Sequence, residues 1–227
     1  MLRAVIYVDG QNLRFKLDAL SLKEKDVNWG ALFASLLPPD HRLLRAYWYQ
    51  AAKVAPWEWN SRHHGRLCPR DMNLDDFRER ATAYYESERV RLETIHSQVY
   101  ERIEREYDAI EFRYNGVLKV NPVEVWGDPE SLKIGKRVGE KGVDVAMAVD
   151  LVRHADHYDT AIVVSGDFDF LPAIQAVKDR LRRVIIVSIM RGHPPHHQGQ
   201  ARRLTSLCDA QVDIWEGDLK DPNRFAR

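Results

Sequence analysis

Short runs of β-branched and aromatic residues, each separated from the next by a helical segment, recur along this 227-residue chain. The clearest runs are residues 3–8, 160–164 and 184–188, which are apolar at nearly every position. Strands that are apolar on both faces are typical of a parallel sheet covered by helices on both sides. The pattern therefore predicts an α/β fold, a Rossmann-like α/β/α sandwich around a central parallel sheet. Weaker runs extend the predicted sheet at residues 43–49, 110–114 and 212–215.

Helices are expected between these strands because apolar residues recur there at steps of three and four. The predicted helices cover residues 11–22, 29–37, 142–155, 169–180 and 202–208. The segment 142–155 is apolar on most faces, so we expect it to be buried. The remaining segments are expected to be a hairpin strand at 116–125, exposed loops at 127–139 and 192–199, and a frayed end at 217–227.

The alternation of strands and helices is interrupted between residues 51 and 107. Residues 51–72 show no period and contain several Pro and Gly residues, which predicts a loop. Residues 73–107 predict an amphipathic helix of about 30 residues, longer than the usual 10–14. We expect one domain over residues 1–227, with residues 51–107 as an insertion. The apolar stripe of the long helix predicts either packing along the domain or a homodimer interface.

Charge and cysteine content narrow the function classes. The chain has 34 Lys plus Arg and 34 Asp plus Glu, so a surface that coats nucleic acid everywhere is excluded, whereas a local basic rim is not. No apolar run approaches the roughly 18 residues of a membrane helix, and the N-terminal run stops at Asp9, too early for a signal peptide. Cys68 and Cys208 cannot form a disulfide framework, which favours a reducing, cytoplasmic location. Neither has a visible base partner for thiol chemistry.

Two predicted strands end in an aspartate beside a glycine. The first continues into residues 8–12 (Val-Asp-Gly-Gln-Asn) and the fourth into residues 165–169 (Ser-Gly-Asp-Phe-Asp). Ligands bind beyond the carboxyl ends of strands in open parallel sheets, so Asp9 and Asp167 would face each other if these strands are neighbours. Asp144 adds a charge at the start of an apolar helix, which costs free energy unless something pairs with it.

Several carboxylates in one crevice repel one another, and a divalent cation removes this repulsion. Mg²⁺ or Mn²⁺ prefers carboxylate oxygens and water, and such an ion can activate a water for phosphodiester hydrolysis. Each aspartate also has a structural explanation, since Asp at a strand end often forms a turn or caps a helix. Asp150 lies roughly 120° round the helix from Asp144 and is better explained by pairing with an arginine or by capping.

Together these motifs resemble the NYN domain, and more closely its LabA-like branch within the PIN-like nuclease superfamily. The resemblance rests on residues 8–12, 141–150 and 164–170 in this order, and on residues 204–213 as the closing helix and strand. It covers about residues 1–50 and 108–216. It implies a PIN-like α/β/α sandwich and metal-dependent ribonuclease activity on RNA.

The resemblance also implies roles for individual residues. Asp9, Asp144 and Asp167 would be the catalytic, metal-binding acids, and Asp169 would assist the Mg²⁺ or Mn²⁺ ion directly or through water. Asn12 would position a ligand or a water, and Lys141 and Ser165 are expected to contact the RNA substrate. The long helix 73–107 departs from a minimal NYN domain, so it would reshape the substrate groove.

Other clusters have weaker functional interpretations. A basic rim for phosphates, or merely a solvated loop, is formed by Lys133, Lys136, Arg137 and Lys141. Base stacking, or merely packing, is available to Tyr47, Trp48, Tyr49, Trp57 and Trp59. Two clusters contain possible zinc ligands: His63, His64 and Cys68 form the first, and His193, His196 and His197 form the second. The spacing in neither cluster matches a regular zinc site.

Two other functions compete with a ribonuclease. A catalytically silent RNA-binding or regulatory adaptor would keep the acidic pocket for structure and bind RNA without turnover. A phosphatase of the haloacid dehalogenase type would need an Asp-x-Asp pair at the end of the first strand. Here Asp9 is followed by Gly10 and Gln11, so the second acid is missing.

Overall fold

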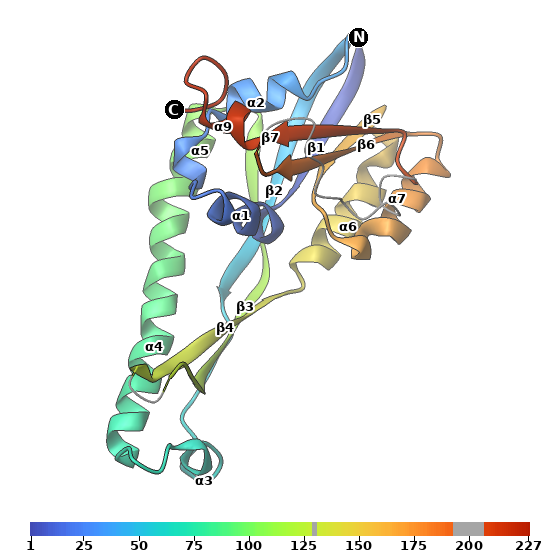
Figure 1. Ribbon diagram of the computed structural model, residues 1–227. Helices are drawn as coiled ribbons and strands as arrows, with labels where there is room; N and C mark the ends of the chain where they lie inside the picture. The colour runs from blue at the N-terminus through green and yellow to red at the C-terminus, as the bar shows by residue number, and fades with distance from the viewer. Residues whose placement is uncertain (129–130, 193–206) are drawn as a thin grey trace.

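The computed structural model describes residues 1–128, 131–192 and 207–227. In these residues a seven-stranded sheet has the order β4-β3-β2-β1-β5-β6-β7 (Figure 1). Neighbouring strands are parallel except β3 and β4, which are antiparallel. The strands are β1 (Leu2–Asp9), β2 (His41–Val54), β3 (Ile110–Trp126), β4 (Lys133–Lys141), β5 (Thr160–Val164), β6 (Arg183–Met190) and β7 (Ala210–Trp215).

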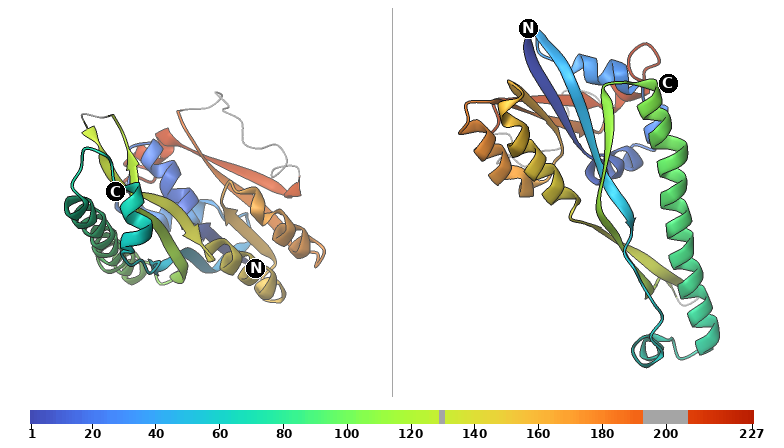
Figure 2. Two further views of the ribbon diagram at one scale, coloured as in Figure 1. Left: turned by 90° about the horizontal axis from the view of Figure 1, so that it is seen from below. Right: turned by 180° about the vertical axis from the view of Figure 1, so that it is seen from behind.

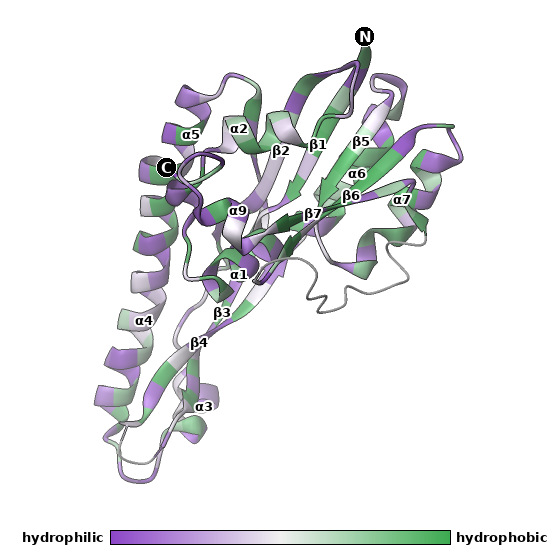
Figure 3. Ribbon diagram, turned by 45° about the horizontal axis from the view of Figure 1, so that its top comes forward, coloured by the Kyte–Doolittle hydropathy of each residue, from purple (hydrophilic) through white to green (hydrophobic). Residues whose placement is uncertain are grey.

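Helices cover both faces of the sheet, which confirms the predicted α/β/α sandwich. On one face α1 (Gly10–Ala19), α2 (Trp29–Ser35) and α9 (Glu216–Lys220) pack against the sheet residues Ile6 and Val8. On the other face α6 (Val143–Arg153) and α7 (Leu171–Lys178) pack against alternate residues of the same strands (Figure 2). Figure 3 shows the mainly hydrophobic strands β1, β5 and β6 between these layers. Successive side chains of a strand point to opposite faces, so these apolar runs supply both cores.

The long predicted helix is confirmed as a continuous helical stretch of three parts, α4 (Leu74–Ile95), a π-helical segment η3 (His96–Tyr100) and α5 (Glu101–Glu106). Asn73 begins it, because its side chain accepts a hydrogen bond from the Asp75 N–H at 2.7 Å. The helix packs along β2, β3 and β4 (Figure 1). Its apolar stripe is buried within this chain, at Phe77, Ala81, Leu92, Tyr100 and Ile103.

The predicted loop 51–72 is wrong in part. Strand β2 continues to Val54, and the later part forms α3 (Ser61–His64) and a 3₁₀ turn η2 (Gly65–Leu67). Asn60 caps α3 by accepting a hydrogen bond from the His63 N–H at 3.0 Å. Capping by a side chain stabilises so short a helix where the apolar pattern gives no signal. Further 3₁₀ turns are η1 (Glu24–Asp26), η5 (His154–Asp156) and η6 (Phe168–Phe170).

The predicted exposed loop 127–139 is also wrong, because β4 occupies most of it and pairs with the long strand β3. Strand β3 itself runs to Trp126, so residues 116–125 continue the strand instead of pairing with 110–114. The glycines of this segment suggest a loop, but Gly135 has a role within strand β4. Its φ is +92°, and a Cβ there would lie 2.2 Å from the ring of Tyr84, so glycine lets the strand pass beneath α4.

Two expectations about exposure are wrong as well. Helix α6 is buried on one face only, because Val145 and Val149 are 66% and 55% exposed. The C-terminal residues are packed rather than frayed: Leu219 and Phe225 are buried, and the Asn28 N–H donates to the Phe225 carbonyl at 2.7 Å. Residues 193–206 lie outside the described residues, and with them most of the predicted loop 192–199 and helix 202–208.

In the described parts of the chain, no helix is long and apolar enough to cross a membrane.

Candidate active site

The carboxyl ends of β1 and β5 lie side by side, which is the condition for Asp9 and Asp167 to face each other. The strands are parallel neighbours in which Val8 pairs with Val164. Strand β2 follows β1 on one side, and β5 lies on the other, so the strand order reverses between β1 and β5. Such a point is where open α/β sheets bind their ligands.

Asp9 is the most buried carboxylate at this point, with 4% of its surface exposed. Its Oδ1 accepts a hydrogen bond from the Asn12 N–H at 3.0 Å, which makes Asp9 the N-cap of α1. Its Oδ2 accepts from Ser165 Oγ at 2.7 Å. Ser165 is 3% exposed, so its hydroxyl is positioned to hold Asp9 rather than to reach into solvent.

The loop after β5 is tied to the same network. The Gly166 N–H donates to Asn12 Oδ1 at 3.2 Å, and the Asp167 N–H donates to Ser165 Oγ at 3.1 Å. Asp167 Oδ1 accepts from the Asp169 N–H at 3.0 Å and so caps the 3₁₀ turn η6. Asp9 and Asp167 therefore have capping roles in addition to any chemical role, whereas Asp169 is exposed.

Asp144 brings a third carboxylate from the first turn of α6. The pKa of Asp9 is raised to about 6, mainly by burial, with a smaller contribution from the charges of Asp144 and Asp167, and the two hydrogen bonds act in the opposite direction. Burial also raises the pKa of Asp144, followed by the charges of Asp167 and Asp169. The four aspartates predicted from the sequence thus share one electrostatic environment with an excess of negative charge.

The donor set suits a hard divalent cation, because Mg²⁺ and Mn²⁺ prefer carboxylate oxygens. The raised pKa values of Asp9 and Asp144 mark charge that such an ion would neutralise. In residues 1–128, 131–192 and 207–227, no three His, Cys, Asp or Glu side chains are already gathered where they could hold a metal ion. Charge and donor type therefore fit the ion, but in the described residues the aspartates are not close enough together for three of them to ligate one ion.

Glu140 is a further acidic group near the aspartates, and no motif in the sequence indicates it. Its pKa is raised to about 7, mainly by burial and less by the charges of Asp9 and Asp144, while the charge of Arg14 lowers it. Its backbone N–H donates to Gln11 Oε1 at 3.4 Å, which links β4 to α1. The sequence offers no signal for it, because its place depends on the pairing of Glu140 with Leu118 across two strands. Lys141, the last residue of β4, is exposed three positions before Asp144.

The aromatic cluster is mainly core. Trp48 and Tyr49 are fully buried, so base stacking on them is excluded. Tyr49 donates its hydroxyl to Asp150 Oδ2 at 2.9 Å, so Asp150 has a structural partner, which is a tyrosine and not the arginine that the sequence suggests. Trp57 and Trp59 pack in a small cluster with Phe77, near the start of α4. Tyr47 is half-buried beneath the guanidinium of Arg113, 4.7 Å from its ring centre.

The predicted basic rim lies on β4, but two of its residues are paired there. Lys136 binds Glu124 at 3.0 Å, and Arg137 binds Glu88 at 2.7 Å. Lys133 lies over the ring of Trp126.

The first histidine cluster has structural contacts. His64 stacks on Trp57, and its Nδ1 accepts a hydrogen bond from the Asn60 N–H at 2.9 Å. Cys68 and Cys208 are free thiols. The second cluster, His193, His196 and His197, lies outside the described residues.

Comparisons with known proteins agree with this arrangement. The family model of the NYN domain matches residues 57–214, a segment that contains Asp144, Asp167 and Asp169 and begins after Asp9. A crystal structure of a protein of unknown function from Vibrio parahaemolyticus is similar in fold, with a TM-score of 0.50 and 15% sequence identity. The similarity covers 99% of this chain and 96% of that one. A search of curated protein sequences found no match.

Proposed function

This chain belongs to the NYN domain family, and on that premise we propose that it is a metal-dependent endoribonuclease that hydrolyses RNA phosphodiester bonds. We place it in the LabA-like branch of the PIN-like nucleases. The observation that carries the proposal is the group of aspartates at the switch point, where burial and neighbouring carboxylates raise the pKa values of Asp9 and Asp144. Such a concentration of negative charge at the switch point of a sheet is typical of a functional site.

We assign the ion to Asp9, Asp144 and Asp167, with Asp169 assisting directly or through water. A bound Mg²⁺ or Mn²⁺ would supply an activated water and neutralise charge on the leaving oxygen. Residues of this chain do the positioning. Ser165 and the Asn12 N–H hold both oxygens of Asp9, and the Asp169 N–H holds Asp167. With a pKa of about 6, Asp9 is mostly ionised at neutral pH.

The RNA strand is expected to meet polar groups at the rim of this site. Asn12 uses its Oδ1 to accept from the Gly166 N–H, which leaves its amide Nδ2 to act as a donor to a phosphate or a water. Lys141 is exposed on the strand that carries Glu140, and its ammonium group would offer a positive charge to the RNA.

The decisive experiment is a cleavage assay on short single-stranded and stem-loop RNAs with Mg²⁺ or Mn²⁺. We expect cleavage that EDTA abolishes and that Asp167→Asn lowers by a factor of at least about 10², the usual effect of losing one electrostatic contribution. Asp156→Asn is the matched control, because the Asp156 side chain is 74% exposed and precedes β5, whereas the site lies beyond the other end of that strand. Full activity in EDTA, or in Asp167→Asn, would contradict the proposal.

A catalytically silent RNA-binding adaptor is the second candidate. It is favoured by the capping roles of Asp9 and Asp167, which would preserve both residues without any chemistry. It predicts RNA binding without turnover and without a requirement for metal. RNA bound tightly by the wild type but left intact under every metal condition would favour it.

A homodimer through residues 73–107 and a cytoplasmic location stay predictions. The buried stripe of α4 packs within the chain, so a dimer would have to use the outer face, where Val90 is 59% exposed. Sedimentation of the wild type and of Val90→Glu would test this interface.

A further inference from the structure

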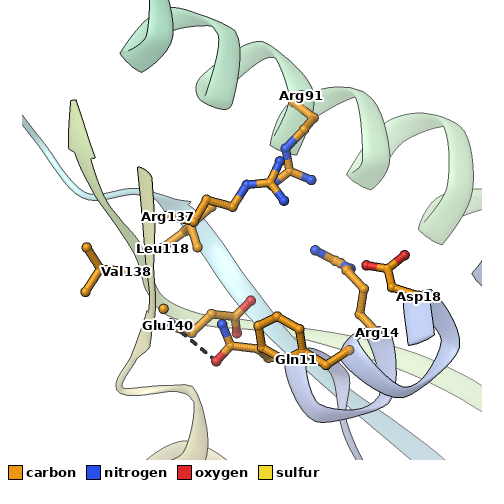
Figure 4. A pocket seen from close by; sticks show the side chains of 10 residues that line it. Gln11, Arg14, Asp18, Arg91, Leu118, Arg137, Val138 and Glu140 are labelled. Carbon is orange, nitrogen blue, oxygen red and sulfur yellow. Dashed lines mark hydrogen bonds between the residues drawn. The ribbon is translucent and has the colours of Figure 1, made fainter. Parts of the chain in front are cut away.

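A groove lined by arginines lies beside the acidic site, between α1, α4 and β4 (Figure 4). One part is a cavity of about 230 Å³ and an adjoining part is about 430 Å³. Arg14, Arg91 and Arg137 line both parts. We call this the arginine groove. Its three arginines come from three elements that are far apart in sequence, and one of these, α4, belongs to the inserted helix.

Two of the arginines are held by a single buried carboxylate. Arg137 donates from Nε to Glu88 Oε2 at 2.7 Å and from a terminal nitrogen to Oε1 at 3.0 Å. Arg91 donates from Nε to Glu88 Oε2 at 3.1 Å. The Glu88 side chain is 8% exposed. One negative charge therefore orients two guanidinium groups, and a positive charge is left over at the groove.

The third arginine is anchored from the opposite wall. Arg14 Nε donates to Glu24 Oε1 at 2.9 Å, and a terminal nitrogen donates to Gln50 Oε1 at 3.3 Å and to the Tyr100 hydroxyl. Figure 4 shows its guanidinium directed toward the space that Arg91 and Arg137 enter from the other side. Arginines held in this way lose little conformational freedom when an anion binds.

The balance of charge in the groove favours an anion. The two parts are lined by five basic residues, which are Arg14, Lys23, Lys25, Arg91 and Arg137, and by three acidic ones, which are Asp18, Glu24 and Glu140. Asp18 pairs with Lys23 and Glu24 pairs with Arg14. Burial lowers the pKa of Arg91, and the neighbouring charge of Arg137 lowers it further, which shows that these cations repel one another. A planar guanidinium group can donate two parallel hydrogen bonds to two oxygens of a phosphate.

A nucleic-acid strand fits the groove better than a lone anion does. Phe15 lines the cavity and is 66% exposed, so its ring is free to stack on a base. Gln11 and Glu140 also line the cavity, the Glu140 N–H donates to Gln11 Oε1 at 3.4 Å, and Gln11 lies two residues after Asp9. The groove and the aspartates are thus adjacent parts of one surface.

We propose that the arginine groove binds a phosphate group of the RNA strand whose scissile bond lies at Asp9, Asp144 and Asp167. This inference rests on the proposed ribonuclease function and names the part of the chain that holds the strand beside the cleavage point. Arg91 and Arg137 contact the phosphate, Phe15 stacks on a neighbouring base, and Glu88 is a positioning residue beneath the two arginines.

The test measures binding without turnover. Fluorescence anisotropy with a labelled single-stranded RNA is recorded in EDTA for Asp167→Asn, alone and combined with Arg91→Ala, Arg137→Ala or Phe15→Ala. We expect each of the three to weaken binding about tenfold, since each removes a charge-assisted hydrogen bond or a stacked base. The two arginine variants should also reduce the slope of log affinity against log salt by about 0.7 for each phosphate that the protein no longer neutralises.

Arg89→Ala is the matched control, because Arg89 lies on the same helix and pairs with Glu86 on the solvent side. It should leave both the affinity and the salt slope nearly unchanged. Phe15→Ala guards against misfolding as an explanation, because the ring is largely exposed. Affinities and salt slopes of the Arg91 and Arg137 variants equal to those of Arg89→Ala would overturn the proposal.

RNAs with different terminal groups distinguish a terminal phosphate from a backbone phosphate as the group that the groove binds. Strands with a 5′-phosphate or a 3′-phosphate are compared with strands that carry hydroxyl ends. If RNA with a terminal phosphate binds more tightly and Arg137→Ala removes this preference, the groove binds a terminal phosphate. If both kinds of RNA bind equally and Arg137→Ala weakens both, the groove binds a backbone phosphate. Binding of a nucleoside monophosphate in the groove with no effect on RNA would overturn the assignment to RNA.

The proposal and the ribonuclease function fail in different ways. RNA binding that depends on Arg91 and Arg137, with no cleavage in any metal, would support the groove and contradict the nuclease. Metal-dependent cleavage with KM unchanged in Arg91→Ala and Arg137→Ala would support the nuclease and overturn the groove.

Discussion

Ser165 Oγ donates a 2.7 Å hydrogen bond to Asp9 Oδ2, and this buried contact joins the ends of β1 and β5 across 156 residues of sequence. Burial raises the pKa of Asp9 to about 6, whereas the bonds from Ser165 and from the Asn12 N–H stabilise the ionised form. The two strands would be neighbours without this bond, but the carboxylate would lose one of the two donors that hold it. The position of the Asp9 carboxylate therefore depends on a hydroxyl that does not face solvent.

Replacing Ser165 by Ala should raise the pKa of Asp9 above its value of about 6. The free energy of unfolding should fall by about 1–3 kcal/mol at pH 8, because a buried ionised acceptor loses its donor. The decrease should be smaller at pH 5, where Asp9 is protonated in a larger fraction of molecules. Chemical denaturation at both pH values measures it.

Ser188→Ala is the control for this prediction. Ser188 is 2% exposed, and among the described residues its Oγ has no hydrogen-bond partner. Its removal should leave the free energy of unfolding nearly unchanged. A decrease in stability in Ser188→Ala as large as that in Ser165→Ala would contradict the role given to the Asp9 bond.

Asp9→Asn should make the protein more stable at neutral and alkaline pH. The folded-state pKa of Asp9 is about 6 and its ordinary value is 3.8, so the wild type loses stability as the pH rises between these values. The decrease amounts to about 3 kcal/mol above pH 6 and is absent below pH 4. Thermal melts from pH 4 to 8 should show an advantage of Asp9→Asn that grows with pH. A difference that does not vary with pH would refute the assignment.

Added Mg²⁺ or Mn²⁺ should raise the melting temperature of the wild type. An ion that binds the folded state stabilises it by about 2.7 kcal/mol at a hundred times its dissociation constant. The response should disappear in Asp9→Asn and Asp167→Asn, which remove carboxylates from the shared cluster. Asp156→Asn should keep it. An equal response in all four proteins would show that the ion binds elsewhere.

Gly10→Ala should destabilise the fold and disturb the site together. A Cβ at this position would lie 2.1 Å from Gln50 Nε2 and 2.4 Å from the Tyr49 carbonyl oxygen. Helix α1 would have to move, at a cost of about 1–3 kcal/mol for overpacking, and Asp9 and Asn12 would move with it. Chemical denaturation should show lower stability, and the cleavage assay should show lower activity on RNA.

Gly166→Ala is the contrasting substitution, because the nearest atom to its Cβ would be Asn12 Oδ1 at 3.7 Å, an ordinary contact. Its stability should stay within about 0.5 kcal/mol of the wild type, as for substitutions that create no clash. Tolerance of Gly10→Ala equal to that of Gly166→Ala would contradict the close approach of α1 to β2.

Local patterns in the sequence are enough to predict the central strands and the acidic residues. Residues 3–8 and 160–164 are apolar on both faces, and a strand of that kind is stable only when it is buried between two layers of helices. The carboxyl ends of such strands lie at one edge of the sheet, so the pattern predicts that Asp9 and Asp167 lie near each other if the two strands are neighbours. The structure supplies that neighbour relation. Residues 73–107 are identifiable as a helix because their apolar period extends over many turns.

Contacts between distant segments decide the rest. Strand β4 contains glycines that look like loop residues, although Tyr84 of α4 covers Gly135. Glu140 lies near the aspartates only because β4 pairs with β3. One cavity is lined by Arg14, Arg91 and Arg137 only because α1, α4 and β4 pack together there. Periodicity and composition indicate which secondary structure and which burial each segment favours by itself. Pairing between strands and the packing of a helix on a distant sheet edge depend on the whole chain, because their free energy comes from contacts that no single segment contains.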